Sequence, residues 1–418
     1  MPQASHFNLK KSSLKRLFFL LVVQQFSLHA DSMSNVVIIP SANYLLAAPY
    51  ATTPVTPTPF SCYNSSENTF FVSWHNSVPY EGQLYISYAI YTANGKIAVP
   101  TNLIFVNQTT PTSDIICCYN SIQNRYFLSW GDTTDSVNTI KYAVLDSQGS
   151  PVGSLYSIGS TSTAFDVFCS FNSQDNQYLL TWVDTSYNGF FSIINEDGSV
   201  SVAKTSITTH TGAVNSTACN IFSSYNPNLN EYLLAWIERD SNVYFSIYSN
   251  EGALLHGPTQ LTSNAIAAGY SVSISYNETT GQYILTWISN NSGTYNAVLA
   301  LCNQSGAIDK SATNLISVNS SATNSYNTYC SKNNQFLVSI LTTNPDTSAI
   351  TPGAFLCNAS GTIVTSSPPI VPSTLSGWNP WGSVFSSYSS ASNTFLLSWM
   401  ISYNSSTTGM SVYSIYTP

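Results

Sequence analysis

The stretch Tyr-Leu-Leu-Thr-Trp at 178–182 returns as Tyr-Leu-Leu-Ala-Trp at 232–236 and as Phe-Leu-Leu-Ser-Trp at 395–399. Its last residue anchors a repeat that runs through the chain, with successive anchors 51 to 59 residues apart. The anchors are Trp74, Trp130, Trp182, Trp236, Trp287, Ile340 and Trp399. Internal repeats overrule the two or three domains that the length of 418 residues would suggest, so we predict one repeat array.

Residues at two fixed distances before each anchor predict a turn. An aromatic residue stands eleven positions before every anchor, and an Asn or Gly stands six positions before it. The latter are Asn68, Asn124, Asn176, Asn230, Gly281, Asn334 and Asn393. Asn and Gly tolerate the left-handed backbone best, so we predict a hairpin turn there and a strand that runs into the anchor. A third strand, a glycine turn and a Thr/Ser-rich fourth strand complete each unit.

Antiparallel four-stranded units without helical periodicity, repeated about every fifty residues, are typical of propeller blades. The sequence therefore predicts an all-β fold, a seven-bladed β-propeller of four-stranded antiparallel blades over residues 41–418. The chain stops before a fourth strand of blade 7, and residues 41–46 resemble 311–316 in the fourth strand of blade 5. We expect residues 41–50 to supply the last strand of blade 7 and so to close the ring.

The first thirty residues look like an export signal. Four basic residues within 10–16 precede the apolar run 17–23, which is too short to span a membrane. We assign 1–30 to a signal peptide and 31–40 to a short leader, and expect a secreted, periplasmic or cell-surface protein. Loss of the signal removes four basic and no acidic residues, which lowers the net charge from -8 to -12. Such an acidic chain is unsuited to nucleic acid.

The repeat, with an aromatic-Asn pair, a short Asn-containing turn and Tyr-Leu-Leu-x-Trp, resembles that of uncharacterised exported bacterial β-propeller repeat proteins. The resemblance covers residues 41–418. It implies the fold and export but no activity, because that group has no catalytic motif that falls on these positions. The Gly-His pairs of WD repeats, the double glycine of kelch repeats and the Asp-box of sialidases are not found in this sequence.

Ligand sites on propellers usually lie on the face that carries the loops between blades, where first strands begin and second strands end. Acidic and amide residues gather at these positions in blades 2 to 4: Asp114, Asp132, Asp166, Asp184, Asn220 and Glu238. This acidic patch would suit sugar hydroxyls or a calcium ion, and no other cofactor is expected. The alternative is that these polar side chains satisfy backbone groups at strand ends.

Two tryptophans interrupt the repeat before the last blade. Trp378 and Trp381 lie in Ser-Gly-Trp-Asn-Pro-Trp-Gly at 376–382, which we assign to the longest connection between blades. They are candidates for stacking on a sugar ring, as are Tyr80 and Tyr187 after second strands, although packing within the loops is the alternative.

These features favour a binding module that presents its loop face to a glycan or to an extracellular or surface protein. The alternative is a glycan-active hydrolase or lyase that uses the acidic patch of blades 2–4, which requires carboxylates that converge in a cleft. No catalytic residues are predicted. We expect a monomer without a membrane span.

Four cysteines fall at equivalent places on the innermost strands of blades 1 to 3: Cys62, Cys117, Cys118 and Cys169. Neighbouring first strands converge near the channel, so we predict at most one disulfide between blades from this set. The alternative is that all eight cysteines of the chain are small packing residues. Cys302 and Cys357 lie on third strands, farther from the axis, and we predict that they do not pair with each other.

Overall fold

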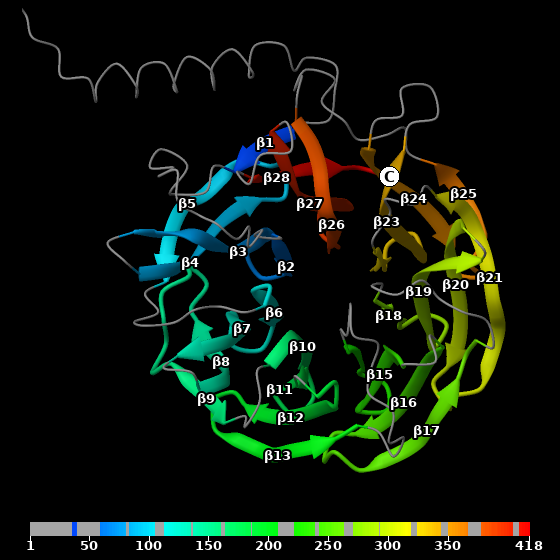
Figure 1. The fold of residues 1–418 in the computed structure, drawn as a ribbon, viewed down its shortest axis with the longest axis horizontal. Coiled ribbons are helices and arrows are strands. Elements are labelled where there is room, and N and C mark those ends of the chain that lie inside the picture. The colour runs from blue at the N-terminus through cyan, green and yellow to red at the C-terminus, as the bar shows by residue number, and fades with distance from the viewer. Residues whose placement is uncertain are drawn as a thin grey trace, which may run out of the picture.

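The computed structural model shows a ring of seven β-sheets around a central axis (Figure 1). Each sheet has four strands, and all strand pairs are antiparallel. The structure describes residues 36–39, 59–80, 83–104, 113–134, 137–159, 164–184, 186–207, 221–238, 242–262, 271–291, 293–318, 324–343, 350–366, 378–403 and 409–418, and within them every regular element is a strand. The predicted seven-bladed propeller is confirmed.

The blades follow the order of the repeats. Blade 1 contains β2 (Phe60–Asn64), β3 (Thr69–Tyr80), β4 (Gln83–Thr92) and β5 (Ile97–Ile104). Blade 2 contains β6 (Ile116–Asn120), β7 (Arg125–Thr134), β8 (Val137–Leu145) and β9 (Tyr156–Gly159). Blade 3 contains β10 (Ala164–Asn172), β11 (Gln177–Asp184), β12 (Gly189–Asn195) and β13 (Val200–Ser206). Blade 4 contains β14 (Phe222–Asn226), β15 (Glu231–Ile237), β16 (Val243–Ser249) and β17 (Leu254–Gln260).

The remaining blades complete the ring. Blade 5 contains β18 (Ser273–Asn277), β19 (Gln282–Asn291), β20 (Thr294–Asn303) and β21 (Ile308–Val318). Blade 6 contains β22 (Ser325–Cys330), β23 (Gln335–Thr343), β24 (Ile350–Asn358) and β25 (Ile363–Ser366). Blade 7 contains β26 (Trp378–Ser389), β27 (Thr394–Tyr403), β28 (Gly409–Tyr416) and, from the other end of the chain, β1 (Val36–Ile39).

An N-terminal strand closes blade 7, but its bounds differ from the predicted ones. Strand β1 pairs with β28, with Val36 opposite Ser414 and Ile39 opposite Ser411. It therefore lies in the stretch 31–40 that was assigned to a leader, and residues 41–50 lie outside the described residues, as does the predicted signal peptide 1–30. An outermost strand has one neighbour and a weak sequence pattern, so the short likeness between 41–46 and 311–316 misplaced it. The β-branched run of β1 itself favours a strand.

The repeat anchors form the core. Each anchor tryptophan is at most 1% exposed, and Ile340 is 2% exposed. The buried clusters draw on neighbouring blades, so that Tyr88 of blade 1, for example, packs with Trp130 of blade 2. Burial of a large anchor side chain in each blade, a tryptophan in six and Ile340 in blade 6, stabilises the sheets against each other.

The hairpin between the first and second strands has the predicted left-handed residue in every blade. The φ angles of its six asparagines lie between 50° and 57°, and that of Gly281 is 67°. The face of the ring that carries these hairpins is called the turn face below, and the opposite face is called the loop face.

A belt of buried asparagines ties the turns of neighbouring blades together. Asn120, ten residues before its anchor, is 0% exposed, and its Oδ1 accepts the backbone N–H groups of Ile122 and Gln123. Its Nδ2 donates to Asn176 Oδ1 (2.7 Å) and to Tyr178 Oη (2.8 Å) in blade 3. Equivalent amide pairs join Asn64 to Asn124, Asn172 to Asn230 and Asn277 to Asn334. Each asparagine therefore caps its own turn and holds the next blade.

Blade 5 breaks this belt, because Gly281 offers no side-chain oxygen to Asn226 of blade 4. We expect Gly281→Asn to stabilise the protein by about 1 kcal/mol, since it adds the missing acceptor and removes the flexibility of glycine. The backbone already has the φ of the other turn asparagines, and the atom nearest to a new Cβ is Oε1 of the flexible Gln304 side chain, at 3.3 Å. Equilibrium denaturation measures the gain.

The matched control is Gly281→Ala, which occupies the same left-handed position without an acceptor and should be less stable than the natural protein. A Gly281→Asn variant no more stable than Gly281→Ala would contradict the role of the belt.

Candidate functional site

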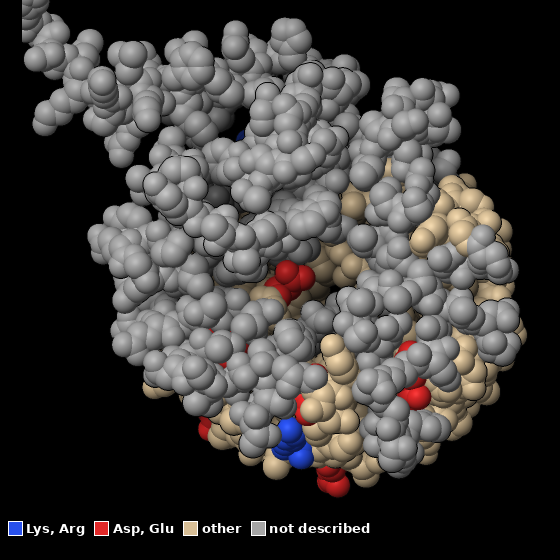
Figure 2. Space-filling model, in the orientation of Figure 1, with Lys and Arg blue, Asp and Glu red and all other residues tan. Residues whose placement is uncertain are grey.

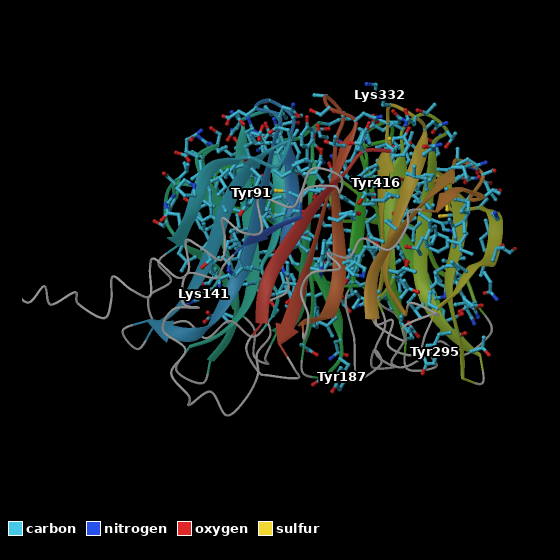
Figure 3. All side chains as sticks on the ribbon, turned by 90° about the horizontal axis from the view of Figure 1, so that it is seen from above. Tyr91, Lys141, Tyr187, Tyr295, Lys332 and Tyr416 are labelled. Carbon is cyan, nitrogen blue, oxygen red and sulfur yellow. The ribbon has the colours of Figure 1, made fainter. Side chains whose placement is uncertain are left out.

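The loop face carries the connections between second and third strands, and Figure 3 shows Tyr187 and Tyr295 on it, opposite Lys332 on the turn face. Asn220 belongs to residues 208–220, which lie outside the described residues. Viewed from this side, acidic residues lie in several separate places, one of them in the central hollow (Figure 2).

In blade 2, the two predicted acids lie at the same end of the sheet. Gly131 donates its N–H to Ser113 Oγ (2.7 Å), which brings the segment with Asp114 against the end of β7 that carries Asp132. Asp132 is 0% exposed and forms an ion pair with Lys141 (Oδ1 to Nζ, 3.5 Å) within the same blade. Asp114, by contrast, is partly exposed.

In blade 3, Asp184 organises the turn that follows β11. Its Oδ1 accepts the N–H groups of Ser186 and Asn188, both at 2.9 Å, and Tyr187 donates its own N–H to the Asp184 carbonyl (2.8 Å). These bonds hold Tyr187 at φ 64°, a conformation that is costly for a bulky residue. One part of its side chain packs on the core between blades 3 and 4, and the rest remains exposed.

In blade 4, Glu238 accepts a hydrogen bond from Trp236, the anchor of its own repeat. The Trp236 indole N–H donates to Glu238 Oε1 (3.2 Å), and Glu238 is 6% exposed. The contacts described here for Asp132, Asp184 and Glu238 thus join groups of one blade each. Those of Asp184 satisfy backbone groups, which is the alternative weighed for strand-end residues. Among the residues that the structure describes, no group of three or more His, Cys, Asp or Glu side chains is arranged to hold a metal ion.

Three further candidates are placed by their backbone alone. Asp166 lies in β10 at an irregularity between Phe165 and Phe168, at the loop-face end of blade 3. Trp378 and Trp381 belong to β26, opposite Tyr403 and Met400, so their assignment to a connection between blades is wrong. The error arose because Gly, Asn and Pro, which are frequent in residues 376–382, are typical of turns. An innermost strand has a partner on one side only, which is why it accepts a proline.

The channel contains a group of aromatic rings that sequence reasoning missed. They stand fourteen residues before their anchors and form a closed series of contacts with ring centroids 4.2 to 5.9 Å apart: Phe60, Phe168, Phe222, Tyr326 and Phe385. Phe60 of blade 1 touches Phe168 of blade 3, and rings from blades that are not neighbours meet only across the axis. The sequence shows the repeated aromatic residue at this position, but it does not show that these rings contact one another at the axis of the ring of blades.

Uncharged polar groups join blades 5 to 7 on the loop-face side of these rings. Ser271 donates its N–H and its hydroxyl to Asn324 Oδ1, and Asn324 Nδ2 donates to Ser383 Oγ (2.7 Å). In blades 5 to 7, the polar residue sixteen positions before the anchor therefore lies beside its equivalents in neighbouring blades. Here it offers amides and hydroxyls, whereas blades 2 and 3 carry Asp114 and Asp166.

No family model and no curated protein sequence matches this chain. Solved structures with the same fold include a lectin from Burkholderia pseudomallei, at 11% identity over 85% of this chain and 98% of that chain, with a TM-score of 0.58. They also include a periplasmic gluconolactonase from Pseudomonas aeruginosa, at 12% identity over 87% and 99%, with a TM-score of 0.51. A putative 6-phosphogluconolactonase from Bacteroides fragilis, at 11% identity over 84% and 92%, also has a TM-score of 0.51.

At this identity the similarity establishes the propeller fold, which both binding proteins and enzymes share. In the part of the chain that the structure describes, there is no helix of the length and apolarity needed to cross a membrane.

Proposed function

We propose that this chain is an exported binding module whose loop face takes up a glycan. The observation that carries the proposal is the backbone conformation of Tyr187. This bulky residue lies on the loop face in a strained left-handed conformation. Asn or Gly would make the same turn without strain, so folding alone does not account for a tyrosine. Strain of this kind concentrates at functional sites. A half-buried phenol with its other side exposed suits stacking on the apolar face of a sugar.

The other candidates on this face supply the polar partners that sugar hydroxyls need. Asp114 at the start of blade 2 and Asp166 in blade 3 are proposed for this role, and so is Asn220, which lies outside the described residues. Trp378 and Trp381, at the loop-face end of β26, are proposed as further stacking residues. A calcium ion between carboxylates of blades 2 and 3 is compatible with this arrangement and is tested below.

Binding is favoured over hydrolysis by the way the acids are used. A glycosidase needs two carboxylates that flank one bond. The described bonds of Asp132, Asp184 and Glu238 lead to a lysine, to turn amides and to an indole of their own blades. A lectin is among the solved structures that share this fold, which is consistent with the proposal.

The test is a glycan array probed with the purified mature protein, with calcium and with a chelator, followed by titration of each sugar that binds. We expect Tyr187→Gly to weaken binding roughly tenfold or more, because the stacking surface is lost. Its melting temperature should change little, since relief of strain offsets the lost packing. Ile122→Ala, at an exposed position on the turn face, is the matched control and should bind as the natural protein does.

Equal binding by Tyr187→Gly, or the absence of any bound glycan, would overturn the proposal. Release of sugar products during the assay would favour the hydrolase or lyase, and binding only to surface proteins would assign the face to a protein partner. Insensitivity to the chelator would remove calcium from the site without affecting the glycan.

A further inference from the structure

Side chains on neighbouring inner strands meet in pairs around the channel wall. In each pair one residue stands twelve positions before its anchor, and its partner stands thirteen positions before the anchor of the next blade. Hydroxyl groups touch in this way between blades 3 and 4, at Ser170 and Ser223 (2.9 Å), and between blades 6 and 7, at Thr328 and Ser386 (2.6 Å). At the seam between blades 7 and 1, Ser387 and Ser61 are 2.7 Å apart.

Cysteines occupy these same two positions between blades 1 and 2 and between blades 2 and 3. Cys62 of β2 faces Cys117 of β6, and Cys118 of β6 faces Cys169 of β10. Cys62 packs with Cys117 in one core cluster, and Cys118 packs with Cys169 in the next. Cys117 Sγ lies 4.0 Å from the backbone carbonyl oxygen of Phe60 in β2, to which it donates, so its thiol reaches the inner strand of blade 1.

The arrangement allows both pairs to act independently. Cys117 and Cys118 are consecutive in β6, so their side chains leave opposite sides of the strand and reach toward different neighbouring blades. All seven cysteines among the described residues, these four included, are free thiols in this structure. Cys302 and Cys357 differ in their place, because they lie on the third strands of blades 5 and 6. That they do not pair with each other stays a prediction.

We propose that Cys62–Cys117 and Cys118–Cys169 are two disulfide sites that cross-link blades 1, 2 and 3 at the channel wall when the protein folds in an oxidising compartment. This is one bridge more than the sequence alone predicted. In each site two S–H bonds break and one S–S bond forms. The two electrons and two protons pass to a disulfide oxidant, such as oxidised glutathione or a disulfide oxidoreductase, which is released as two thiols.

The burial of the thiols determines when the two disulfides can form during folding. Burial and the neighbouring thiol raise the pKa of Cys62, and burial and Cys169 raise that of Cys118, so thiolate is scarce once the ring has closed. The bridges therefore form while the blades assemble. Export, which the proposed glycan function also assumes, would supply the oxidant, but the cross-links do not depend on any ligand.

The experiment refolds the full mature chain with reduced and oxidised glutathione, alkylates remaining thiols and maps peptides without reduction. We expect both cross-links, with Cys302, Cys330 and Cys357 alkylated. Alkylation of all four inner-strand cysteines would overturn the proposal.

Pairing is resolved with double variants, because Cys117 and Cys118 share a peptide. Cys62→Ser with Cys117→Ser should keep one bridge, and so should Cys118→Ser with Cys169→Ser. Cys62→Ser with Cys118→Ser should form none. Serine is the residue found at equivalent pairs elsewhere in the ring, so these variants are expected to fold.

A bridge in the Cys62→Ser, Cys118→Ser variant would refute the proposed pairing. Reduction should lower the melting temperature of the natural protein by roughly 5 °C or more, and should not change that of the variant in which all four are serine. An equal change in both would also refute the cross-links.

Discussion

A chain that lacks residues 31–50 is expected to melt roughly 5 °C below the intact protein, from a loss of about 4 kcal/mol. The deletion removes β1, which is the fourth strand of blade 7 and the only contact by which the N-terminal end of the described chain joins the C-terminal end in one sheet. Without β1, strand β28 becomes an exposed edge with unpaired backbone groups. The backbone hydrogen bonds between β1 and β28, which close the ring, are lost. Thermal denaturation followed by circular dichroism measures the change.

The control is a deletion of residues 31–35, which leaves β1 in place and should melt as the intact protein does. If both deletions have the same melting temperature, the closure of the ring by β1 is refuted. The longer deletion should also increase self-association, since the free edge of β28 can pair with a second chain, and light scattering would detect this.

Asn120→Ala is expected to cost about 3 kcal/mol, a large effect for a polar substitution. The buried amide accepts two backbone N–H groups in its own turn and donates to Asn176 and Tyr178 of the next blade. Alanine removes the buried bond to Tyr178 and the three part-buried bonds to Asn176, Ile122 and Gln123, so it cannot stabilise the turn. Urea denaturation of the variant and of the natural protein gives the difference in free energy of unfolding.

Asn120→Asp separates the two roles of this side chain. It keeps an oxygen for the turn but loses the donor to Asn176, so we expect a loss smaller than that of the alanine variant and still measurable. Ser121→Ala, at an exposed position in the same turn, should be near neutral. Equal stability of Asn120→Ala and the natural protein would show that the belt contributes nothing.

The sequence alone determined the number of blades, the order of the strands and the left-handed turns. These features are local, since a residue such as Asn124 or Trp130 carries its preference wherever the fold places it. A pattern repeated seven times then leaves little ambiguity, and the one imperfect anchor, Ile340, is as buried as its equivalents.

Tertiary structure alone decided what each repeated position does once the blades meet. Whether Asp184 binds a ligand or its own turn, where β1 ends, which rings touch Phe60 and which thiol faces Cys118 all depend on contacts between segments far apart in the chain. A repeat sequence predicts how the strands pair within one blade. It does not predict the distances across the axis or between the inner strands of neighbouring blades. Those distances are set by the closure of the ring, because only then do seven first strands converge on a common channel.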